Sequence, residues 1–593
     1  MKETVFDLQD FASMQAFEVL NIADLPTGEL EVKVSQLRAE AVRLGLTKTE
    51  FNKILASYLK KHGPRATQNS FIGIPGDYSI DPYFIDTRGR ICKAIGETVV
   101  CICSHPLYIA QRLVNITTGE QKIEIGYSRD GGKTWKHEIV NRSVISSART
   151  ITQLCDFGIS ATSENARHLV AYLQHFEDIN YEQLATVQSI GRFGWINEYS
   201  FSPYAEEDGI IFDSQNSFME IRAALNSAGS YDKWLELARK IRTGSSLIPK
   251  IVLAASFASV LIGPTKAMPF FVHLWGSTGT GKSVALMLAA SVWANPEIGK
   301  YIKSFNSTAV AQETLAGTLY SLPLILDELQ SIKDRQSFDK LIYELSEGSG
   351  RARGTVTGGL RETLTWKNCM ITSGEQPITQ ELSGGGAKNR IIEIECKEKL
   401  LPDLIGAAKV IRENYGYAGR EFVESLSPKM VRTAKKIQES TFLNLVESGR
   451  TEKQSLAASV IIAAESLVSE IIFKDKKSFD TEDIVQFLIT EEEASSGMRA
   501  YEWLRGWIVQ NGSKFNEDSQ EVFGKNLSGG TAIIASVLRT ACEKEGISLQ
   551  SLAADLEKLG VLDLDPRGKR SKPVKIGRKS VRCYIVNDEF SDD

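Results

Sequence analysis

The stretch from Phe270 to Val284 constrains the fold of this chain more than any other feature. It reads FFVHLWGSTGTGKSV, an apolar run of strand length followed by the pattern G-x-x-x-x-G-K-S. The residues after it, up to Val292, are apolar and alanine-rich, as in a buried helix. A strand, a glycine-rich loop and a helix in this order distinguish a phosphate-binding loop from a chance match. We therefore expect a nucleotide-binding α/β domain around this stretch.

The residue types of the loop suit the binding of a nucleoside triphosphate. Glycines leave room for backbone N–H groups to point at phosphate oxygens, and the helix N-terminus adds partial positive charge. Lys282 would reach the β- and γ-phosphates of ATP, and the Ser283 hydroxyl would bind Mg²⁺. A glycine turn with an accidental Lys-Ser pair is the alternative. The predicted ATP-binding residues of the loop are Gly276, Ser277, Thr278, Gly279, Thr280, Gly281, Lys282 and Ser283.

A second apolar stretch, Leu322 to Gln330, contains the acids Asp327 and Glu328 about forty residues after the loop. This separation leaves room for a crossover helix and one more strand. An acid at the carboxyl end of a parallel strand faces the ligand crevice of an α/β sheet. Asp327 would then hold Mg²⁺, and Glu328 would polarise the attacking water. A helix N-terminus, which favours acids, is the alternative.

Length and composition limit the remaining possibilities. The chain has 593 residues, too many for one hydrophobic core, and a net charge of −5, so DNA binding would need a local basic surface. The eight cysteines lack C-x-x-C spacing, which favours reduced, buried thiols in a cytoplasmic protein over zinc sites. The longest apolar run, Ile251 to Ile262, is too short to cross a bilayer, so no membrane association is expected.

Changes of hydrophobic period along the chain predict a multidomain α/β protein. Helical spacing dominates the first sixty or so residues, strand-like segments separated by turns follow, and helical patterns return on both sides of the loop domain. The expected domains are a helical module over 1–63, a β-rich or mixed domain over 77–200, a helical connector over 201–245, a P-loop ATPase domain over 246–400, a helical lid over 401–490 and a winged-helix-like domain over 495–593.

Two arginine-bearing loops lie within the ATPase segment. The first is rich in glycine and arginine and has no acid before Glu362, which predicts a basic β-hairpin directed at DNA phosphates. A solvated hairpin without a ligand is the alternative. The second loop ends in Arg390 at the start of a strand, where an arginine can enter a neighbouring subunit's nucleotide site. An ordinary arginine at a strand start is the alternative. The candidate DNA-binding residues of the first loop are Arg351, Arg353 and Arg361.

The C-terminal segment combines an amphipathic helix that ends at Gly560, a basic stretch and a final strand. This order resembles a winged helix, whose wing contacts the DNA backbone. A solvated basic hairpin is the alternative. The stretch from Pro566 to Arg582 has eight cations and no acid. The predicted DNA-binding residues within it are Lys569, Arg570, Lys572, Arg578 and Lys579.

Three segments, Leu322 to Gln330, Gly350 to Gly354 and Trp366 to Glu375, resemble a group of helicases and inactivated derivatives from phages and integrating mobile elements. Over residues 80–480 the chain looks most like the MCM-like AAA+ replicative helicases of staphylococcal cassette chromosome elements. The resemblance implies an AAA+ ATPase core, hexameric rings, ATP hydrolysis between subunits and translocation on single-stranded DNA.

The same resemblance implies roles for individual residues. Thr372 or Ser373 falls at the sensor 1 position, where MCM proteins usually have asparagine, and Lys453 falls near sensor 2, where they usually have arginine. Arg390 matches the arginine finger. The implied catalytic residues are Lys282, Glu328 and Arg390, with Thr372, Ser373 and Lys453 also near ATP. Because the hydrolytic set is present, including Ser283 and Asp327, we expect an active protein.

Two functions fit these motifs. The first is an ATP-dependent DNA helicase that replicates a mobile element, with single-stranded DNA in the ring and duplex origin DNA at the C-terminal domain. The alternative is an ATP-switched, origin-binding initiator or DNA remodeller that does not unwind processively. Strand displacement on a fork without an origin sequence distinguishes them. A third possibility, an inactive structural relative, would show no ATP turnover.

Overall fold

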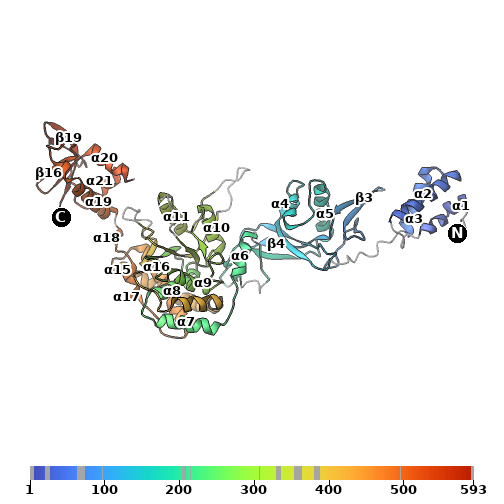
Figure 1. Cartoon of the computed structure of the whole chain (residues 1–593), viewed down its shortest axis with the longest axis horizontal. Helices are drawn as coiled ribbons and strands as arrows, with labels where there is room; N and C mark the ends of the chain where they lie inside the picture. Colours follow the sequence, from blue (N-terminus) through green and yellow to red (C-terminus); the bar gives the residue numbers. More distant parts are fainter. Residues whose placement is uncertain are drawn as a thin grey trace. The chain divides into compact units, whose positions relative to one another are not determined.

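The computed structural model divides the chain into two compact units, Met1–Ser189 and Ile190–Asp593 (Figure 1). The division falls before the boundary near residue 200 that the sequence suggested. The structure describes residues 6–20, 27–62, 74–96, 98–198, 200–203, 209–213, 216–305, 307–328, 335–352, 363–379, 388–494, 496–545 and 547–588.

The first unit begins with helices around a small aromatic core. Phe11, Phe17 and Phe51 are fully buried, and their rings contact one another. Thr47 and Glu50 close the start of the last helix as a capping box, because each side chain accepts the other's backbone N–H. The elements are α1 (Leu8–Ala12), η1 (Gln15–Leu20), α2 (Thr27–Arg43) and α3 (Lys48–His62).

The rest of the first unit is rich in β-strands. An antiparallel sheet has the order β1-β2-β3, and a second sheet contains the consecutive neighbours β7-β4-β5-β6, in which only the β4–β7 pair is parallel. Helix α5 packs against β3 and β4. The elements are β1 (Tyr83–Ile85), β2 (Ile91–Ile95), β3 (Thr98–Cys103), β4 (Leu107–Asn115), β5 (Gln121–Tyr127), β6 (Lys136–Asn141), α4 (Arg142–Ile145), η2 (Ile151–Phe157), α5 (Ala166–Ile179) and β7 (Thr186–Ile190).

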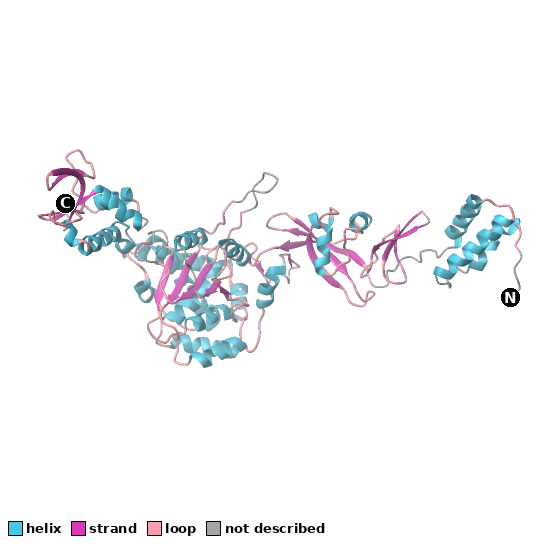
Figure 2. Cartoon of the chain, turned by 45° about the horizontal axis from the view of Figure 1, so that its top comes forward, coloured by secondary structure: helices cyan, strands magenta, loops and turns pink. Residues whose placement is uncertain are grey.

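The second unit contains a parallel sheet surrounded by helices (Figure 2). Strand β14 lies between β11, which leads into the glycine loop, and β13, which ends in Asp327. Because the strands are parallel, the carboxyl ends of all three meet at one edge of the sheet. In spatial order the strands are β12 (Lys303–Ser304), β13 (Leu324–Asp327), β14 (Cys369–Gly374), β11 (Phe270–Trp275) and β15 (Ile391–Glu395).

Further elements precede and follow these strands. They are β8 (Gly194–Trp195), β9 (Phe201–Ser202), β10 (Ile211–Phe212), α6 (Asn216–Ala224), α7 (Tyr231–Thr243), α8 (Ile248–Leu261), α9 (Lys282–Ser291), α10 (Ala309–Leu319), α11 (Arg335–Glu347), α13 (Leu404–Glu413), α14 (Ala418–Ser425), α15 (Pro428–Glu447), α16 (Glu452–Val468), η5 (Ser469–Phe473), α17 (Thr481–Ile484), η6 (Val485–Phe487) and α18 (Glu491–Ala494).

Two apolar helices from distant parts of the sequence, α8 and α16, pack against each other in this core. One apolar cluster spans residues 190–488, so the connector, the ATPase segment and the lid share a core, whereas the sequence suggested separate regions. Among the described residues one helix, Glu452–Phe473, is long and apolar enough to cross a membrane, but 83% of its most apolar window is buried inside the protein. Its apolar surface is therefore used in internal packing.

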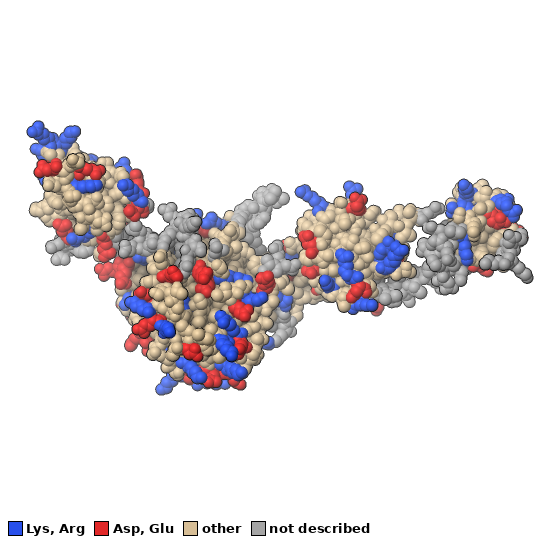
Figure 3. All heavy atoms as spheres, viewed as in Figure 1, with Lys and Arg blue, Asp and Glu red and all other residues tan. Residues whose placement is uncertain are grey.

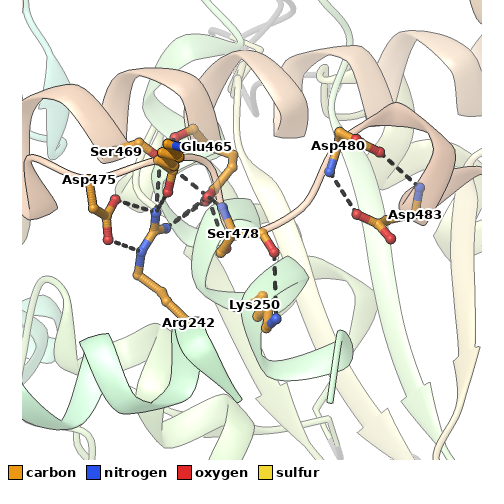
Figure 4. A network of polar contacts seen from close by, with 9 residues as sticks. Arg242, Lys250, Glu465, Ser469, Asp475, Ser478, Asp480 and Asp483 are labelled. Atoms are coloured by element: carbon orange, nitrogen blue, oxygen red, sulfur yellow. Dashed lines mark hydrogen bonds and ion pairs between the residues drawn. The ribbon is translucent and has the colours of Figure 1, made fainter. Parts of the chain in front are cut away.

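Arg242 on α7 lies in a buried ion network (Figure 4). Its guanidinium donates to both carboxylate oxygens of Glu465 at 2.9 Å, and the two side chains are each 2% exposed. It also donates to Asp475 at 2.8 Å and to Ser469 Oγ at 2.9 Å. Removing one partner of a buried ion pair is strongly destabilising. The network therefore fixes α7 against the C-terminal end of α16.

The C-terminal segment has its own apolar core, which includes Tyr501, Leu538 and Leu556. Its four-stranded antiparallel sheet has the order β16-β17-β19-β18. Helices α20 and α21 follow each other directly before the hairpin β18–β19, as expected for a winged helix. The elements are α19 (Ser496–Gln510), η7 (Gly512–Phe515), β16 (Gly524–Leu527), β17 (Gly530–Ile534), α20 (Ala535–Lys544), α21 (Leu549–Lys558), β18 (Lys572–Ile576) and β19 (Lys579–Asn587).

All eight cysteines are free thiols. Six are buried, but Cys101 and Cys155 are exposed, which corrects the expectation that all would be buried. Within the described parts of the chain, no group of three or more metal-binding side chains could hold a metal ion.

Candidate nucleotide site

The predicted phosphate-binding loop joins β11 to α9 at the carboxyl edge of the sheet. Gly276, Gly279 and Gly281 have φ angles of 134°, 87° and 101°, in the left-handed region that favours glycine. A Cβ at Gly276 would lie 2.8 Å from the carbonyl oxygen of Cys396, and one at Gly281 would lie 2.3 Å from Leu404. The backbone path favours glycine at both positions, and at Gly276 the close approach to the Cys396 backbone also requires it.

Lys282 and Ser283 form the first turn of α9, directly after the loop. The Lys282 ammonium donates to the carbonyl oxygens of Gly276 and Ser277 at 2.7 and 2.8 Å, so it lies over the loop. Ser283 is exposed at the start of the helix. The first N–H groups of a helix have no partner within it, so the loop presents both a cation and backbone donors to an anion.

Asp327 ends β13 beside the end of β14. It is buried, and one of its carboxylate oxygens accepts hydrogen bonds from the Ser373 hydroxyl and, at 3.0 Å, from the backbone N–H of Glu328. Glu328 is exposed and has a φ of 61°. A non-glycine residue in this conformation stores roughly 1–3 kcal/mol of strain, which is typical of functional sites. Asp327, Ser373 and Glu328 therefore form one polar group at this edge.

Thr372, the other candidate for sensor 1, is directed elsewhere. Its hydroxyl lies 2.9 Å from Nδ1 of His273 on β11, and His273 Nε2 lies 3.0 Å from the carbonyl oxygen of Gln376. Since a carbonyl can only accept, Nε2 carries the proton and Thr372 donates to Nδ1. Burial lowers the pKa of His273 to about 4, so the ring is neutral. The structure therefore brings Ser373, and not Thr372, to Asp327.

The segment after β14 also contacts the glycine loop. The Thr278 hydroxyl donates to a carboxylate oxygen of Glu375 at 3.0 Å, and both residues are exposed. Glu375 thus connects the loop to the end of β14, and His273 connects β11 to the same segment.

Arg390 lies at the opposite edge of the sheet. It precedes β15, and the pairing of Phe271 with Ile391 puts it level with the start of β11. The Arg390 guanidinium is paired with Glu347 and stacks over the ring of Tyr343 at 4.0 Å. Its side chain is 4% exposed. At about 3.3 Å per residue along β11, the glycine loop of the same chain is about 20 Å away.

Lys453, the residue near sensor 2, also lies at this amino edge. It lines a small pocket with Arg390, Met268 and Phe270. Burial and the nearby Arg390 lower the pKa of Lys453. The structure therefore groups Lys453 with Arg390, away from the glycine loop of the same chain.

Gln454, the next residue on α16, fixes the start of β15. Its amide NH₂ donates to the carbonyl oxygens of Ile391 at 2.6 Å and Lys388 at 3.1 Å, and its amide oxygen accepts the N–H of Ile489 at 2.8 Å. The side chain is buried. Gln454 thus positions the backbone on both sides of Arg390.

The predicted basic hairpin begins as an antiparallel pair. The N–H of Gly350 donates to the carbonyl oxygen of Leu364 at 2.8 Å, and Ser349 forms a bridge with Thr365. Arg351 is half-exposed and forms an ion pair of 2.7 Å with Glu344. The other two candidates, Arg353 and Arg361, lie outside the described residues.

The five predicted DNA-binding residues of the C-terminal segment lie on and beside the hairpin β18–β19. Lys569, Arg578 and Lys579 are exposed. Arg570 pairs with Glu557 at 2.6 Å, and Lys572 pairs with Asp563 at 2.5 Å. All five therefore belong to this hairpin or to the loop before it, and two of them form an ion pair with an acid.

Sequence reasoning missed His273, Glu347, Glu375 and Gln454. Glu347 and Gln454 contact a predicted site residue or its neighbours across 43 and 63 residues of sequence. His273 was visible as a polar residue inside an apolar strand, which signals a buried hydrogen-bond partner. No comparable signal marked the other three.

Two family models match the chain. The domain of unknown function DUF927 matches residues 87–364, and the Cch helix turn helix domain matches residues 495–590. The second match covers the consecutive helices α20 and α21 and the hairpin β18–β19. No curated protein matches the chain.

A solved structure of the active helicase Cch of SCCmec type IV is similar over most of the chain. The TM-score is 0.62 at 19% sequence identity, over 86% of this chain and 98% of that one. A JCV helicase structure also aligns, with a TM-score of 0.17 and 10% identity over 55% of this chain and 74% of that one, too low to support an argument. The resemblance to helicases of cassette chromosome elements is thus confirmed for the fold, a mixed α/β multidomain protein with a C-terminal helix-turn-helix domain.

Proposed function

We propose that this chain is an ATP-dependent DNA helicase, an MCM-like AAA+ translocase that replicates a mobile genetic element as a hexamer. One observation carries the proposal: the glycine loop, Lys282, Asp327 and Ser373 converge at the carboxyl edge of a parallel sheet. The insertion of β14 between β11 and β13 supports an AAA+ core, because it brings a sensor residue between the loop and the acid. The fold shared with the helicase Cch points to the same function.

The residues at this edge fit ATP and Mg²⁺. The loop offers backbone donors and the Lys282 ammonium to phosphates, while the Ser283 hydroxyl and the Asp327 carboxylate are oxygen ligands of the kind that Mg²⁺ prefers. Bound Mg²⁺ would neutralise charge on the phosphate oxygens. Thr278 and Thr280 belong to the same loop, and Ser373 orients Asp327 through its hydrogen bond.

Each chain residue then has a defined task in hydrolysis. Lys282 holds the β- and γ-phosphates, and Glu328 orients the attacking water from its strained position next to Asp327. Arg390 stabilises the charge that develops on the γ-phosphate of a neighbouring subunit. Its distance of about 20 Å from the loop of its own chain favours action between subunits. Lys453, beside Arg390, would reach the same neighbouring site.

DNA would contact two places. The hairpin that starts at Ser349 and contains Arg351, Arg353 and Arg361 would move along single-stranded DNA in the ring. The C-terminal domain would hold duplex DNA through the basic hairpin β18–β19.

The ATPase rate with and without single-stranded DNA tests the proposal, on the wild type and on the Glu328→Gln and Arg390→Ala variants, with the oligomer mass measured alongside. We expect stimulation by DNA in the wild type and its loss in both variants while the oligomer persists. An ATPase rate that ignores DNA, or a fully active Arg390→Ala variant, would overturn the ring-motor mechanism.

The helix-turn-helix match also supports a second candidate, an ATP-switched initiator that binds an origin without processive unwinding. Strand displacement on a fork without origin sequence decides between the two. Displacement supports the helicase, and ATP turnover without displacement supports the initiator.

A further inference from the structure

The basic hairpin of the C-terminal domain differs in charge from the helix beside it. We define the wing as residues 566–582, which include β18, the turn after it and the start of β19. The wing contains eight cations and no acid. Figure 3 shows Lys and Arg gathered at the tip of this domain. The exposed cations of the wing are Arg567, Lys569, Arg570, Lys575, Arg578, Lys579 and Arg582.

Strand pairing directs part of this charge outward. Lys575 pairs with Ser580, and Pro573 pairs with Arg582, so Lys575 and Arg582 lie on one face of the hairpin. The opposite face carries Val574 and Ile576, which pack against a small apolar cluster, and has Lys572 and Lys579 at its ends. Because side chains alternate across a strand, the packing of Val574 and Ile576 fixes the outward direction of Lys575 and Arg582.

Part of this charge has no acidic partner. Among the described residues, the side chains of Arg567, Lys575, Arg578 and Lys579 form no ion pair, whereas Arg570 and Lys572 do. Lys569 and Arg582 interact electrostatically with Asp565, just before the wing. The exposed cations without an acidic partner create a local positive potential in a chain whose net charge is −5.

Helix α21, the second helix of the helix-turn-helix, has the opposite character. It contains the acids Asp555 and Glu557 and one cation, Lys558, so its formal charge is −1. It has no arginine, and its exposed side chains that can pair with bases are Gln550, Ser551 and Lys558. A base-reading helix normally places such side chains in the major groove. The charge and hydrogen-bonding capacity for DNA therefore reside mainly in the wing.

We infer that this domain binds duplex DNA through the phosphate contacts of its wing, independently of base sequence. The inference rests on the proposed function for its choice of DNA as the ligand. It goes further because it makes the binding independent of base sequence and excludes sequence recognition by α21. Phosphates along the DNA backbone match a row of cations on an extended hairpin, and contacts to phosphate carry no sequence information.

The test measures binding of the full chain, without nucleotide, to two blunt duplexes of unrelated sequence and equal length over a range of salt concentrations. The wing variant is Lys575→Glu/Arg578→Glu/Lys579→Glu. The matched control, Lys429→Glu/Arg432→Glu/Lys436→Glu, reverses three exposed cations on α15. The helix variant is Gln550→Ala/Ser551→Ala. Thermal melting verifies that each variant is folded.

We expect the wild type to bind both duplexes equally. The wing variant should bind about 100-fold more weakly, with a slope of log K against log salt that is smaller by about 3. The control and the helix variant should bind like the wild type. A wing variant with unchanged affinity, a helix variant that loses binding, or a preference for one duplex would overturn the inference. A duplex RNA of the same length is measured alongside, and tighter binding to it would also overturn the inference.

A separate measurement shows whether the helicase proposal is wrong. ATP turnover and strand displacement by the wild-type chain decide whether the protein is a helicase. If neither occurs while the wing variant still loses duplex binding, the inference about the wing stands and the helicase proposal fails.

Discussion

The two edges of the central sheet hold their candidate residues in different ways. At the carboxyl edge, Lys282 is partly exposed and donates to a carbonyl oxygen of the loop, and Glu328 is exposed. At the amino edge, Arg390 is buried, paired with Glu347 and stacked on Tyr343. The carboxyl edge is a site that a ligand can enter directly, whereas Arg390 is held in place by its own chain.

Because of this difference, the two edges require different changes before ATP can be bound and hydrolysed as proposed. The carboxyl edge already has the backbone path and the polar contacts of a nucleotide site. If Arg390 acts on a neighbouring subunit as proposed, it has to leave Glu347, or be presented together with it, when that subunit docks. In that case subunit contact would control hydrolysis through the amino edge.

The largest expected effect is the recovery of ATPase activity when two inactive variants, one from each edge of the sheet, are mixed. Failure to recover activity would contradict the proposed division of labour between the two edges. Lys282→Ala and Arg390→Ala should each lower the ATPase rate about 10³-fold. If the two residues serve one site from different subunits, mixing the variants in equal amounts restores about a quarter of the sites. The measurement is the ATPase rate against mixing ratio. The control mixes Lys282→Ala with the variant that carries both substitutions, which cannot restore a complete site. Recovery of activity in the control, or no recovery in the first mixture, contradicts action between subunits.

The pH dependence of stability tests the neutral histidine that connects β11 to β14. The pKa of His273 falls from 6.5 to about 4 on folding, so the unfolded state binds more protons between these values. The contribution of the neutral His273 to the free energy of unfolding is complete above pH 6.5. It is lost as the pH falls toward 4, and the total loss is about 3 kcal/mol. Melting temperatures across this range check the effect. His273→Gln should show a flatter dependence, and an equally steep one would assign the loss to other groups.

Two substitutions on α11 compare the acid that pairs with the buried Arg390 and the acid that pairs with the half-exposed Arg351. Glu347→Gln leaves the buried Arg390 without its carboxylate and should cost about 1–2 kcal/mol of unfolding free energy, since Glu347 itself is 41% exposed. Glu344→Gln removes the partner of the half-exposed Arg351 and should cost less than about 0.5 kcal/mol. Urea unfolding measures both. Equal losses would show that Arg390 is not held more tightly than Arg351.

The smallest expected effect concerns the strain at Glu328. Glu328→Gly should raise the unfolding free energy by about 1 kcal/mol, because glycine adopts a φ of 61° without strain, yet it should abolish ATP hydrolysis. Lys266, with a φ of 60° and an exposed position away from the loop, provides the control. Lys266→Gly should stabilise the protein similarly and retain activity. A Glu328→Gly variant that is active would remove Glu328 from the site.

The sequence predicted the carboxyl edge better than the amino edge for a physical reason. The loop residues Gly276 to Ser283 form one continuous segment whose spacing alone specifies its chemistry. Asp327 followed from an apolar strand with an acid at its end. The burial of Arg390 depends on Glu347 and Tyr343, which reach it only after folding. The choice of Ser373 over Thr372 depended on which face of β14 meets Asp327.

The packing of whole helices was also not predictable from the sequence, because it depends on contacts that form only on folding. Helical spacing identified the segments before and after the ATPase domain, but it did not reveal that α8 and α16 share one core. Both helices are apolar on nearly all sides, so neither pattern specifies a partner.

The pairing of α8 with α16 has a consequence for the synthesis of the protein. Helix α8 is complete about 190 residues before α16 begins, an interval of roughly 10–40 s at a translation rate of 5–20 residues per second. During that time the apolar surface of α8 that α16 later covers is open to water or to a chaperone. The nascent chain therefore has to be protected from aggregation until the lid has left the ribosome.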